Sequence, residues 1–375
     1  MNAIFGLDGL LIGTLLPFLF VLTVVVFVHE MGHYLVGRWC GIGVRAFSIG
    51  FGPELIGFND RRGTRWKLSA VPLGGYVKFV GDMTATSAPD EDGLDELTPE
   101  ERRIAFHTQP VWKRALTVVA GPLFNFILTV AVFAVMYGAY GRMVSEPVVA
   151  EIVAGSAAEE AGFRQGDRFV SVDGHRITTF GDVQREVSGR AGDEMVFVMM
   201  RDGAEVTLTA TPRVTEQKDG LGNTVKVGII GVVNNEQYGQ PRLITYGPLE
   251  AVGEAVMETA SIIERTSQFL QRFAFGREDK CQLGGPVKIA KMSGQAAQLG
   301  FVWLVQLVAL LSVGIGFLNL LPIPPLDGGH LVFYAIEAAI RRPVPLPVME
   351  AVYRVGLFMV LMFMAFVIWN DFFAC

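Results

Sequence analysis

The residues best suited to chemistry in this sequence are two histidines and a glutamate, His29, Glu30 and His33, in the pattern His-Glu-x-x-His. On an α-helix, residues four positions apart differ in direction by about 40° and in height by about 6 Å. The two imidazoles can therefore bind one metal ion, while the glutamate can hold a water molecule beside it. Imidazole donors with a neighbouring carboxylate favour zinc, although the pattern alone does not exclude another divalent metal.

A catalytic zinc ion usually takes three protein ligands and leaves one position for water, so a third ligand is needed. We predict Asp327, which ends the stretch Asn319-Leu-Leu-Pro-Ile-Pro-Pro-Leu-Asp327. The prolines interrupt the helix there, which a membrane tolerates only where the freed backbone is buried or lines a wet cavity. His330 and Glu337 remain alternative third ligands at this point.

The composition and the distribution of apolar residues indicate a polytopic α-helical membrane protein. Hydrophobic residues make up 51% of the 375 residues and charged residues only 18%, against roughly 45–50% and 25% in soluble domains. A helix needs about 20 apolar residues to cross the hydrocarbon core of a bilayer. We predict four transmembrane helices, at residues 9–33, 115–138, 300–326 and 353–370.

Basic residues near the helix ends predict the orientation, because short loops rich in Lys and Arg stay in the cytoplasm. They follow the first helix, precede the second and lie between the third and fourth: Arg38, Arg45, Lys113, Arg114, Arg341 and Arg342. Both termini and the long loop at residues 138–299 should therefore face away from the cytoplasm. In a bacterium this arrangement places the chain in the inner membrane, with that loop in the periplasm.

The loop after the first helix, residues 44–81, predicts a β-hairpin. Two strand-like pieces flank the turn-rich sequence Asn59-Asp-Arg-Arg-Gly63. Glycines in Gly50-Phe51-Gly52 and Gly74-Gly75 would let another chain approach the backbone closely, since glycine has no side chain to obstruct it. The polar and acidic stretch that follows, residues 88–103, predicts a solvated loop.

The chain divides into four parts: an N-terminal membrane half at 1–143, a small α/β module at 144–215, a connecting region at 216–299 and a C-terminal membrane half at 300–375. The module alternates short apolar strands with glycine turns. The connecting region carries Leu249, Val252 and Val256 at three- to four-residue steps. This spacing predicts an amphipathic helix, which can lie on the membrane surface or cover the module.

Other classes of protein fit the sequence poorly. A net charge of -6 without a long basic run provides no electrostatic footprint for nucleic acid. Cys40, Cys281 and Cys375 are far apart and lack paired spacing, so they suggest neither a disulfide framework nor a cysteine zinc site. No Lys or Arg precedes the first apolar run and no small-residue cleavage pattern follows it, so we expect this segment to remain in the mature protein.

Three motifs carry a family resemblance: His29-Glu-Met-Gly-His33, Gly121-Pro-Leu-Phe-Asn125 and the stretch from Asn319 to Gly329. They resemble the site-2 protease family of intramembrane zinc proteases, and are most similar to the bacterial regulator of sigma-E protease group. Residues 156–174 resemble a PDZ domain of the bacterial protease-associated type. PDZ domains bind extended peptides at a sheet edge, so the resemblance implies one docking module with a peptide partner, whereas some relatives carry two in tandem.

The resemblance also implies roles for individual residues. It implies one zinc ion per chain, with His29, His33 and Asp327 as ligands and Glu30 as the catalytic base. It implies that Asn319 holds the substrate backbone. The hairpin, with its two glycine-rich pieces, would dip into the membrane and pair with an unwound substrate segment.

The sequence therefore predicts an intramembrane zinc metalloendopeptidase. The resemblance implies its substrates: transmembrane segments of single-span membrane proteins, an anti-sigma factor already cut on its outer side first among them and leftover signal peptides next. Two other functions stay open: a membrane-anchored metalloprotease that cuts soluble clients, and a non-catalytic scaffold that holds partners through its PDZ module. A transporter also has broken helices, but four spans without an inverted repeat argue against it.

Overall fold

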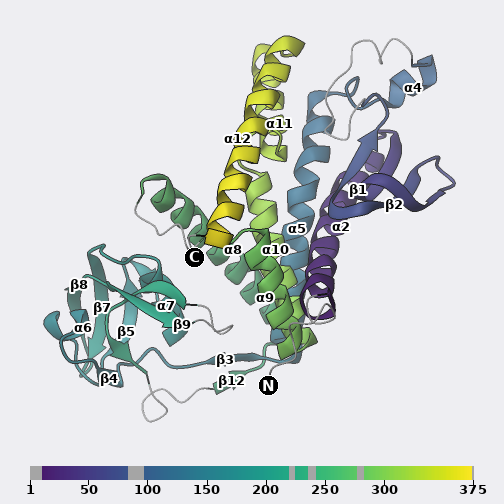
Figure 1. Cartoon of the computed structure of the whole chain (residues 1–375). Helices are drawn as coiled ribbons and strands as arrows, with labels where there is room; N and C mark the ends of the chain where they lie inside the picture. The colour runs from purple at the N-terminus through teal and green to yellow at the C-terminus, as the bar shows by residue number, and fades with distance from the viewer. Residues whose placement is uncertain (1–10, 83–96, 219–223, 235–241, 277–282, 374–375) are drawn as a thin grey trace. The chain divides into compact units, whose positions relative to one another are not determined.

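The computed structural model describes residues 11–82, 97–218, 224–234, 242–276 and 283–373, and Figure 1 labels its helices and strands. The chain forms two compact units. Unit 1 consists of Met1–Phe133, Ala255–Ile263 and Leu283–Cys375, and unit 2 of Ala134–Glu254 and Glu264–Gln282. The first two residues of the predicted first helix, residues 88–96, Cys281 and Cys375 lie outside the described residues.

Four helices of the described residues are long and apolar enough to cross a membrane. They are α2 (Leu16–Trp39, preceded by the π-helical turn η1, Leu11–Leu15), α5 (Val111–Ala139), α10 (Phe301–Asn319) and α12 (Leu346–Phe373). A helix satisfies its backbone hydrogen bonds internally, as the interior of a bilayer requires. The four long apolar helices that the sequence predicts are therefore present, and the chain is a membrane protein.

Two of these helices end at positions that differ from the predicted ones. α2 continues past His33 to Trp39, and Gly41, with a φ of 81°, then supplies the left-handed residue that commonly stops a helix. α10 ends at Asn319, short of the predicted limit at residue 326. The three prolines that follow Asn319 lack a backbone N–H and cannot continue the helical hydrogen bonds.

Two charged segments outside the predicted transmembrane helices are helical. α12 begins before the predicted start at residue 353, and its Glu350 and Arg354 form an ion pair of 3.0 Å across one turn. α4 (Pro99–Ile104) lies within the stretch predicted as a loop. Its first turn is a capping box, in which the Thr98 hydroxyl and the Glu101 carboxylate each accept the other residue's backbone N–H. The loop prediction is wrong here, because such a cap can start a short helix in a polar sequence.

α2 contacts several neighbours within unit 1: α10, α9 (Pro286–Leu299) and the two strands that follow it. Its contact with α10 and α9 is an enclosed apolar cluster formed by Val21, Val25, Ala296, Leu304, Leu307 and Val308. Against α5, Gly32 permits a close approach, because a Cβ there would overlap the backbone oxygen of Ala120. The helix that carries His29 and His33 is therefore held on several sides.

Strands β1 (Val44–Asn59) and β2 (Arg65–Phe79) form an antiparallel pair that packs beside α2 (Figure 1). Both strands bend, so that residues 46–49 pair with 65–68 on one side and with 75–78 on the other. Gly74, with a φ of 122°, stands at the bend just before the segment 75–78. Within the described residues, this segment is paired with β1 alone and forms an outer edge of the folded pair.

Asp60, in the turn between β1 and β2, ties this pair to α2. Its carboxylate accepts the backbone N–H groups of Arg62 and Thr64 at 2.8 and 2.9 Å, and the Trp66 indole N–H at 3.1 Å. The Tyr34 hydroxyl of α2 donates to it at 3.3 Å. Burial raises the pKa of Asp60, but these hydrogen bonds outweigh it and hold the pKa at about 2. Tyr34 follows His33 directly, so the network anchors the strands next to the histidines.

Unit 2 contains an antiparallel sheet in the order β6-β5-β7-β8, formed by His175–Arg176, Arg168–Val172, Met195–Arg201 and Ala204–Ala210. Helices α6 (Ala157–Glu160) and α7 (Phe180–Ser188) complete its core. Three two-stranded pairs accompany it: β3 with β12 (Arg142–Val144, Arg242–Ile244), β4 with β11 (Glu151–Ile152, Val232–Val233) and β9 with β10 (Arg213–Lys218, Thr224–Ile229). Alternate strand residues such as Met195, Phe197 and Met199 are fully buried, as one covered sheet face requires.

α8 (Pro248–Ala274) is shared between the two units along its length. Its alanines Ala251 and Ala255 are buried, whereas Leu249, Val252 and Val256 are 87%, 45% and 50% exposed. The connecting region thus contains a long helix in which several of the larger apolar residues near its start are exposed.

Candidate metal centre

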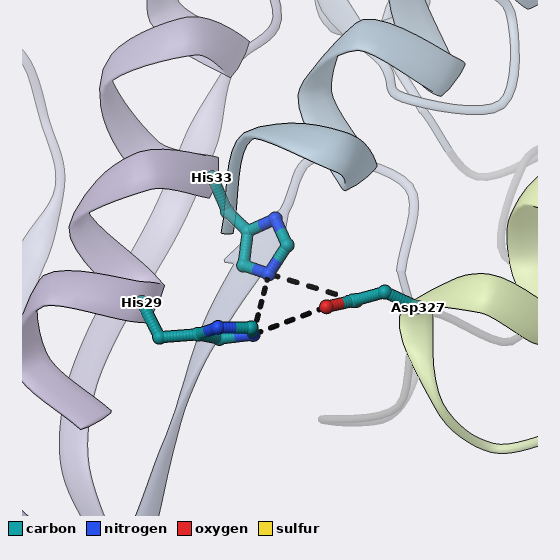
Figure 2. A group of neighbouring side chains, drawn as sticks. All are labelled: His29, His33 and Asp327. Atoms are coloured by element: carbon teal, nitrogen blue, oxygen red, sulfur yellow. Dashed lines mark hydrogen bonds and ion pairs between the residues drawn. The ribbon is translucent and has the colours of Figure 1, made fainter. Parts of the chain in front are cut away.

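Three potential metal ligands meet in unit 1. His29 and His33 project from α2, and Asp327 is the first residue of α11 (Asp327–Ile340), as Figure 2 shows. Nε2 of His29 lies 3.2 Å from Nε2 of His33 and 3.1 Å from Oδ2 of Asp327. Nε2 of His33 lies 3.6 Å from Oδ1 of Asp327. Among the described residues, this is the one group of at least three potential ligands that could hold a metal ion.

The separations fit a tetrahedral zinc ion. Zinc bonds of about 2.0–2.2 Å at tetrahedral angles place neighbouring donor atoms about 3.3–3.6 Å apart. The three observed separations span 3.1 to 3.6 Å. Oδ2 of Asp327 is buried, and apart from Nε2 of His29 at 3.1 Å no described residue offers it a hydrogen bond. A buried carboxylate beside two imidazole nitrogens suits a cation, and two imidazoles with one carboxylate are the donor set that zinc takes.

Each histidine has a second contact that orients its ring. Nδ1 of His33 lies 2.9 Å from the backbone oxygen of Thr117, which can only accept, so Nδ1 carries the proton and Nε2 keeps its lone pair. Nδ1 of His29 lies 3.2 Å from the side-chain nitrogen of Asn125. Thr117 and Asn125 both belong to α5. Sequence reasoning gave neither residue a role, although Asn125 stands in one of the quoted motifs.

Gly121 of α5 leaves the space in which the two imidazoles meet. A Cβ at this position would overlap the ring of His33 and lie 2.9 Å from Cε1 of His29. Glycine is therefore the residue that lets the α5 backbone pass directly beside the candidate ligands.

Two glycines after Asp327 let α11 start against the proline-rich loop. A Cβ on Gly328 would overlap the backbone oxygen of Leu321, and one on Gly329 would lie 2.8 Å from the backbone nitrogen of Pro324. Further along α11, Glu337 accepts a hydrogen bond of 2.6 Å from Arg114 of α5. The Arg114 guanidinium also lies 5.0 Å from the centre of the Tyr334 ring. These contacts fix α11, and with it Asp327, against α5.

The two alternative third ligands are outside the ligand group. Glu337 is engaged by Arg114. His330 lies one turn after Asp327, lines the same cavity and is 2.7 Å from the Tyr353 hydroxyl through its Nδ1. The geometry therefore brings Asp327, and neither alternative, together with His29 and His33.

A cavity of about 330 Å³ opens over the three residues. Glu30 lines it beside them and packs against Gly75, whose Cβ would lie 3.1 Å from the Glu30 Cγ. Of the predicted substrate contacts, Asn319, Phe51, Gly74 and Gly75 line the cavity. Gly50 and Gly52 are not among the described residues that line it; they lie at the bend of β1.

Comparison with known proteins gives consistent matches over the whole chain. The Peptidase family M50 profile matches residues 17–363. A Mesorhizobium japonicum protein named as a zinc metalloprotease is 73% identical over 365 residues, covering 97% of this chain and 100% of its own. A similarly named protein of Agrobacterium fabrum is 53% identical over 371 residues, covering 99% and 98%. Metalloprotease MmpA of Caulobacter vibrioides is 41% identical over 379 residues, covering 95% and 94%.

Proposed function

This chain belongs to peptidase family M50 and is a zinc metalloprotease, and we propose that it cuts peptide bonds inside the membrane-spanning segments of other proteins. The resemblance seen in three sequence motifs is thereby confirmed. One observation carries the proposal: His29 and His33 lie on α2, a helix long and apolar enough to cross a membrane. A metal centre on such a helix acts at membrane depth.

The proposed chemistry divides between the metal and Glu30. When bound by His29, His33 and Asp327, zinc would supply Lewis acidity and lower the pKa of a water molecule. The Glu30 carboxylate lines the cavity beside these residues without belonging to the ligand group. It takes the proton of the attacking water and then delivers it to the leaving amide nitrogen. The bond from the water oxygen to the carbonyl carbon forms first, and the bond from carbon to nitrogen breaks once the nitrogen has received the proton.

The folded β1–β2 pair supports a mode of substrate binding. Gly75, Tyr76 and Val77 line the cavity in succession, along the outer edge formed by residues 75–78. A peptide bond inside a helix is shielded by its own hydrogen bonds, so the substrate must unwind before it is cut. An unwound segment can add to a strand edge, which then satisfies its freed backbone groups. Asn319 also lines the cavity. We assign its side-chain amide to binding the substrate backbone.

The proposed substrates, docking domain and membrane location rest on the sequence motifs and on the positions of basic residues. We assign single-span membrane proteins as substrates, an anti-sigma factor first and leftover signal peptides next. Residues 144–215 would serve as a PDZ-type docking domain for a peptide partner. The basic residues near the helix ends support an inner-membrane location, with the termini and this domain in the periplasm and the metal centre toward the cytoplasm.

Comparative membrane proteomics of the wild type and Glu30→Gln tests the proposal. The variant keeps the candidate metal ligands but lacks the proton acceptor, so it should still bind zinc and stay inserted. Intact single-span proteins should accumulate in the variant only. Proteolysis retained by Glu30→Gln would contradict the mechanism, and accumulation of soluble proteins instead would favour the alternative of soluble clients.

A further inference from the structure

Asn125 is a buried amide in the middle of a helix that can cross a membrane. It is fully buried in α5, and its side-chain nitrogen lies 3.2 Å from Nδ1 of His29. Its side-chain oxygen is buried and has no hydrogen-bond partner among the residues that the structure describes. Burying an amide at such a position costs free energy unless the amide is hydrogen-bonded, so a buried amide inside a spanning helix indicates a functional contact. The nearest group on which it can act is the imidazole of His29.

The chemistry of the candidate metal centre decides which end of the amide must face His29. Nε2 of His29 points to Nε2 of His33 and to Asp327, so it must keep its lone pair to bind a metal. The ring proton then sits on Nδ1, which becomes a donor and needs an acceptor. The amide nitrogen is also a donor, whereas the amide oxygen is an acceptor of the same size. A half-turn of the amide presents its oxygen to Nδ1.

The backbone around Asn125 is held in place by hydroxyl groups. The Ser312 hydroxyl of α10 donates to the backbone oxygen of Asn125 at 3.0 Å. The Thr129 hydroxyl lies 3.0 Å from that same oxygen and 3.0 Å from the backbone oxygen of Ala309. Ser312, Thr129 and Ala309 are all fully buried. Asn125 therefore sits where α2, α5 and α10 meet, with little freedom to move its amide away from His29.

The two histidines are supported by different kinds of acceptor. His33 uses the backbone oxygen of Thr117, which every residue at that position would supply. His29 depends on a side chain, so its support can be removed by one substitution. We propose that Asn125 is a positioning residue whose side-chain oxygen accepts the Nδ1–H of His29, which fixes the ring and keeps Nε2 free for the metal. This inference rests on the proposed zinc function and adds a residue to it.

Zinc affinity of the purified full-length protein tests the inference, measured by competition with a chromophoric chelator. Loss of such a supporting hydrogen bond typically lowers metal affinity about 10- to 100-fold, and we expect Asn125→Ala to do so. Asn125→Asp still presents an oxygen to Nδ1, so it should bind zinc more tightly than Asn125→Ala and within about tenfold of the wild type. Ser293→Ala is the matched control, since this fully buried hydroxyl bonds to Ile289 within α9.

A second readout separates ring orientation from general damage. With cobalt in place of zinc, Asn125→Ala should change the visible absorption bands of the metal, and Ser293→Ala should leave them unchanged. Wild-type zinc affinity and an unchanged cobalt spectrum in Asn125→Ala would overturn the inference. Equal losses in Asn125→Ala and a folded Asn125→Asp would also overturn it, because the acceptor oxygen would then not matter. A wild-type protein without stoichiometric zinc would instead contradict the proposed function itself.

Discussion

Two aspartates, Asp327 in unit 1 and Asp167 in unit 2, show how differently the two units use a carboxylate removed from water. Asp167 is saturated: the Arg201 guanidinium donates to both of its oxygens at 2.7 Å, and the Arg164 backbone N–H donates at 2.8 Å. The hydrogen bonds that Arg201 donates to Asp167 also raise the pKa of Arg201, which keeps the pair charged. Oδ2 of Asp327, by contrast, has Nε2 of His29 at 3.1 Å and no backbone N–H or cationic side chain among the described residues within hydrogen-bond distance.

The difference separates a structural carboxylate from a reactive one. In unit 2 the buried charge is matched within the same sheet and holds β5 to β7 and the turn before β5. In unit 1 the carboxylate points to the Nε2 atoms of two imidazoles (Figure 2). A metal ion requires nitrogen and oxygen atoms that other protein groups do not already occupy.

Replacing Asp327 should have the largest effect. Asp327→Asn keeps the shape but removes the charged donor, so bound zinc and peptidase activity should both fall below detection. The chain should still insert, because four apolar helices do not depend on this residue. Metal analysis and cleavage of a single-span substrate check the prediction. An Asp327→Asn enzyme with full activity would show that the Asp327 carboxylate is not a metal ligand.

Gly121→Ala should reduce activity by about 100-fold, because displacement of a catalytic group by about 1 Å has effects of that size. The added methyl group would overlap the ring of His33. Gly314→Ala in α10 is the control, since a Cβ there would meet no neighbouring heavy atom within 4 Å among the described residues. The rates of both variants on one substrate give the answer. Equal rates would mean that α5 does not crowd the metal centre.

Breaking the Arg114–Glu337 pair should have a smaller effect on activity, since it acts on Asp327 through the length of α11. Glu337→Gln leaves the Arg114 charge without its partner in a mostly buried place, a change that destabilises proteins by about 3 kcal/mol or more. Glu350→Gln breaks an exposed pair with Arg354 and should change stability by under about 1 kcal/mol. Thermal unfolding of the two variants in detergent measures both. Equal stabilities of the two variants would show that the Arg114–Glu337 ion pair does not fix α11 against α5.

Asp167→Asn should leave peptidase chemistry unchanged and affect unit 2 only. It strips Arg201 of its partner and should destabilise the β5–β7 sheet by about 3 kcal/mol. Glu160→Gln, which breaks an exposed pair with Arg213, is the control. Hydrogen exchange of the β5 and β7 amides reports on the sheet, and cleavage of a short substrate reports on the site. Unchanged exchange in Asp167→Asn would mean that this carboxylate is not structural.

Part of the site follows from the sequence because it depends on local geometry. His29 and His33 share a helix face at a spacing of four residues, and Glu30 comes with them. The prolines before Asp327 mark a broken helix, which predicts where a distant carboxylate can be tolerated. The four apolar helices follow in the same way from length and composition.

Other parts of the site depend on contacts that no local pattern encodes. The acceptor for His33 is the backbone of Thr117, which any residue at that position would supply. The space beside Gly121 is visible only once α2 and α5 are packed. The double pairing of residues 46–49 comes from bends in both strands, and these bends decide which residues of β1 and β2 reach the cavity. Gly50 and Gly52, predicted as substrate contacts because glycine leaves the backbone open, lie at the bend of β1 and are not among the described residues that line the cavity.

The most direct test of intramembrane cleavage is the position of the cut. Purified wild-type protein and Glu30→Gln are reconstituted into lipid vesicles with a single-span substrate, and the products are identified by mass spectrometry. The account predicts zinc-dependent cleavage of a peptide bond within the apolar segment of the substrate, by the wild type only. Cleavage confined to bonds outside that segment, or equal cleavage by Glu30→Gln, would contradict it.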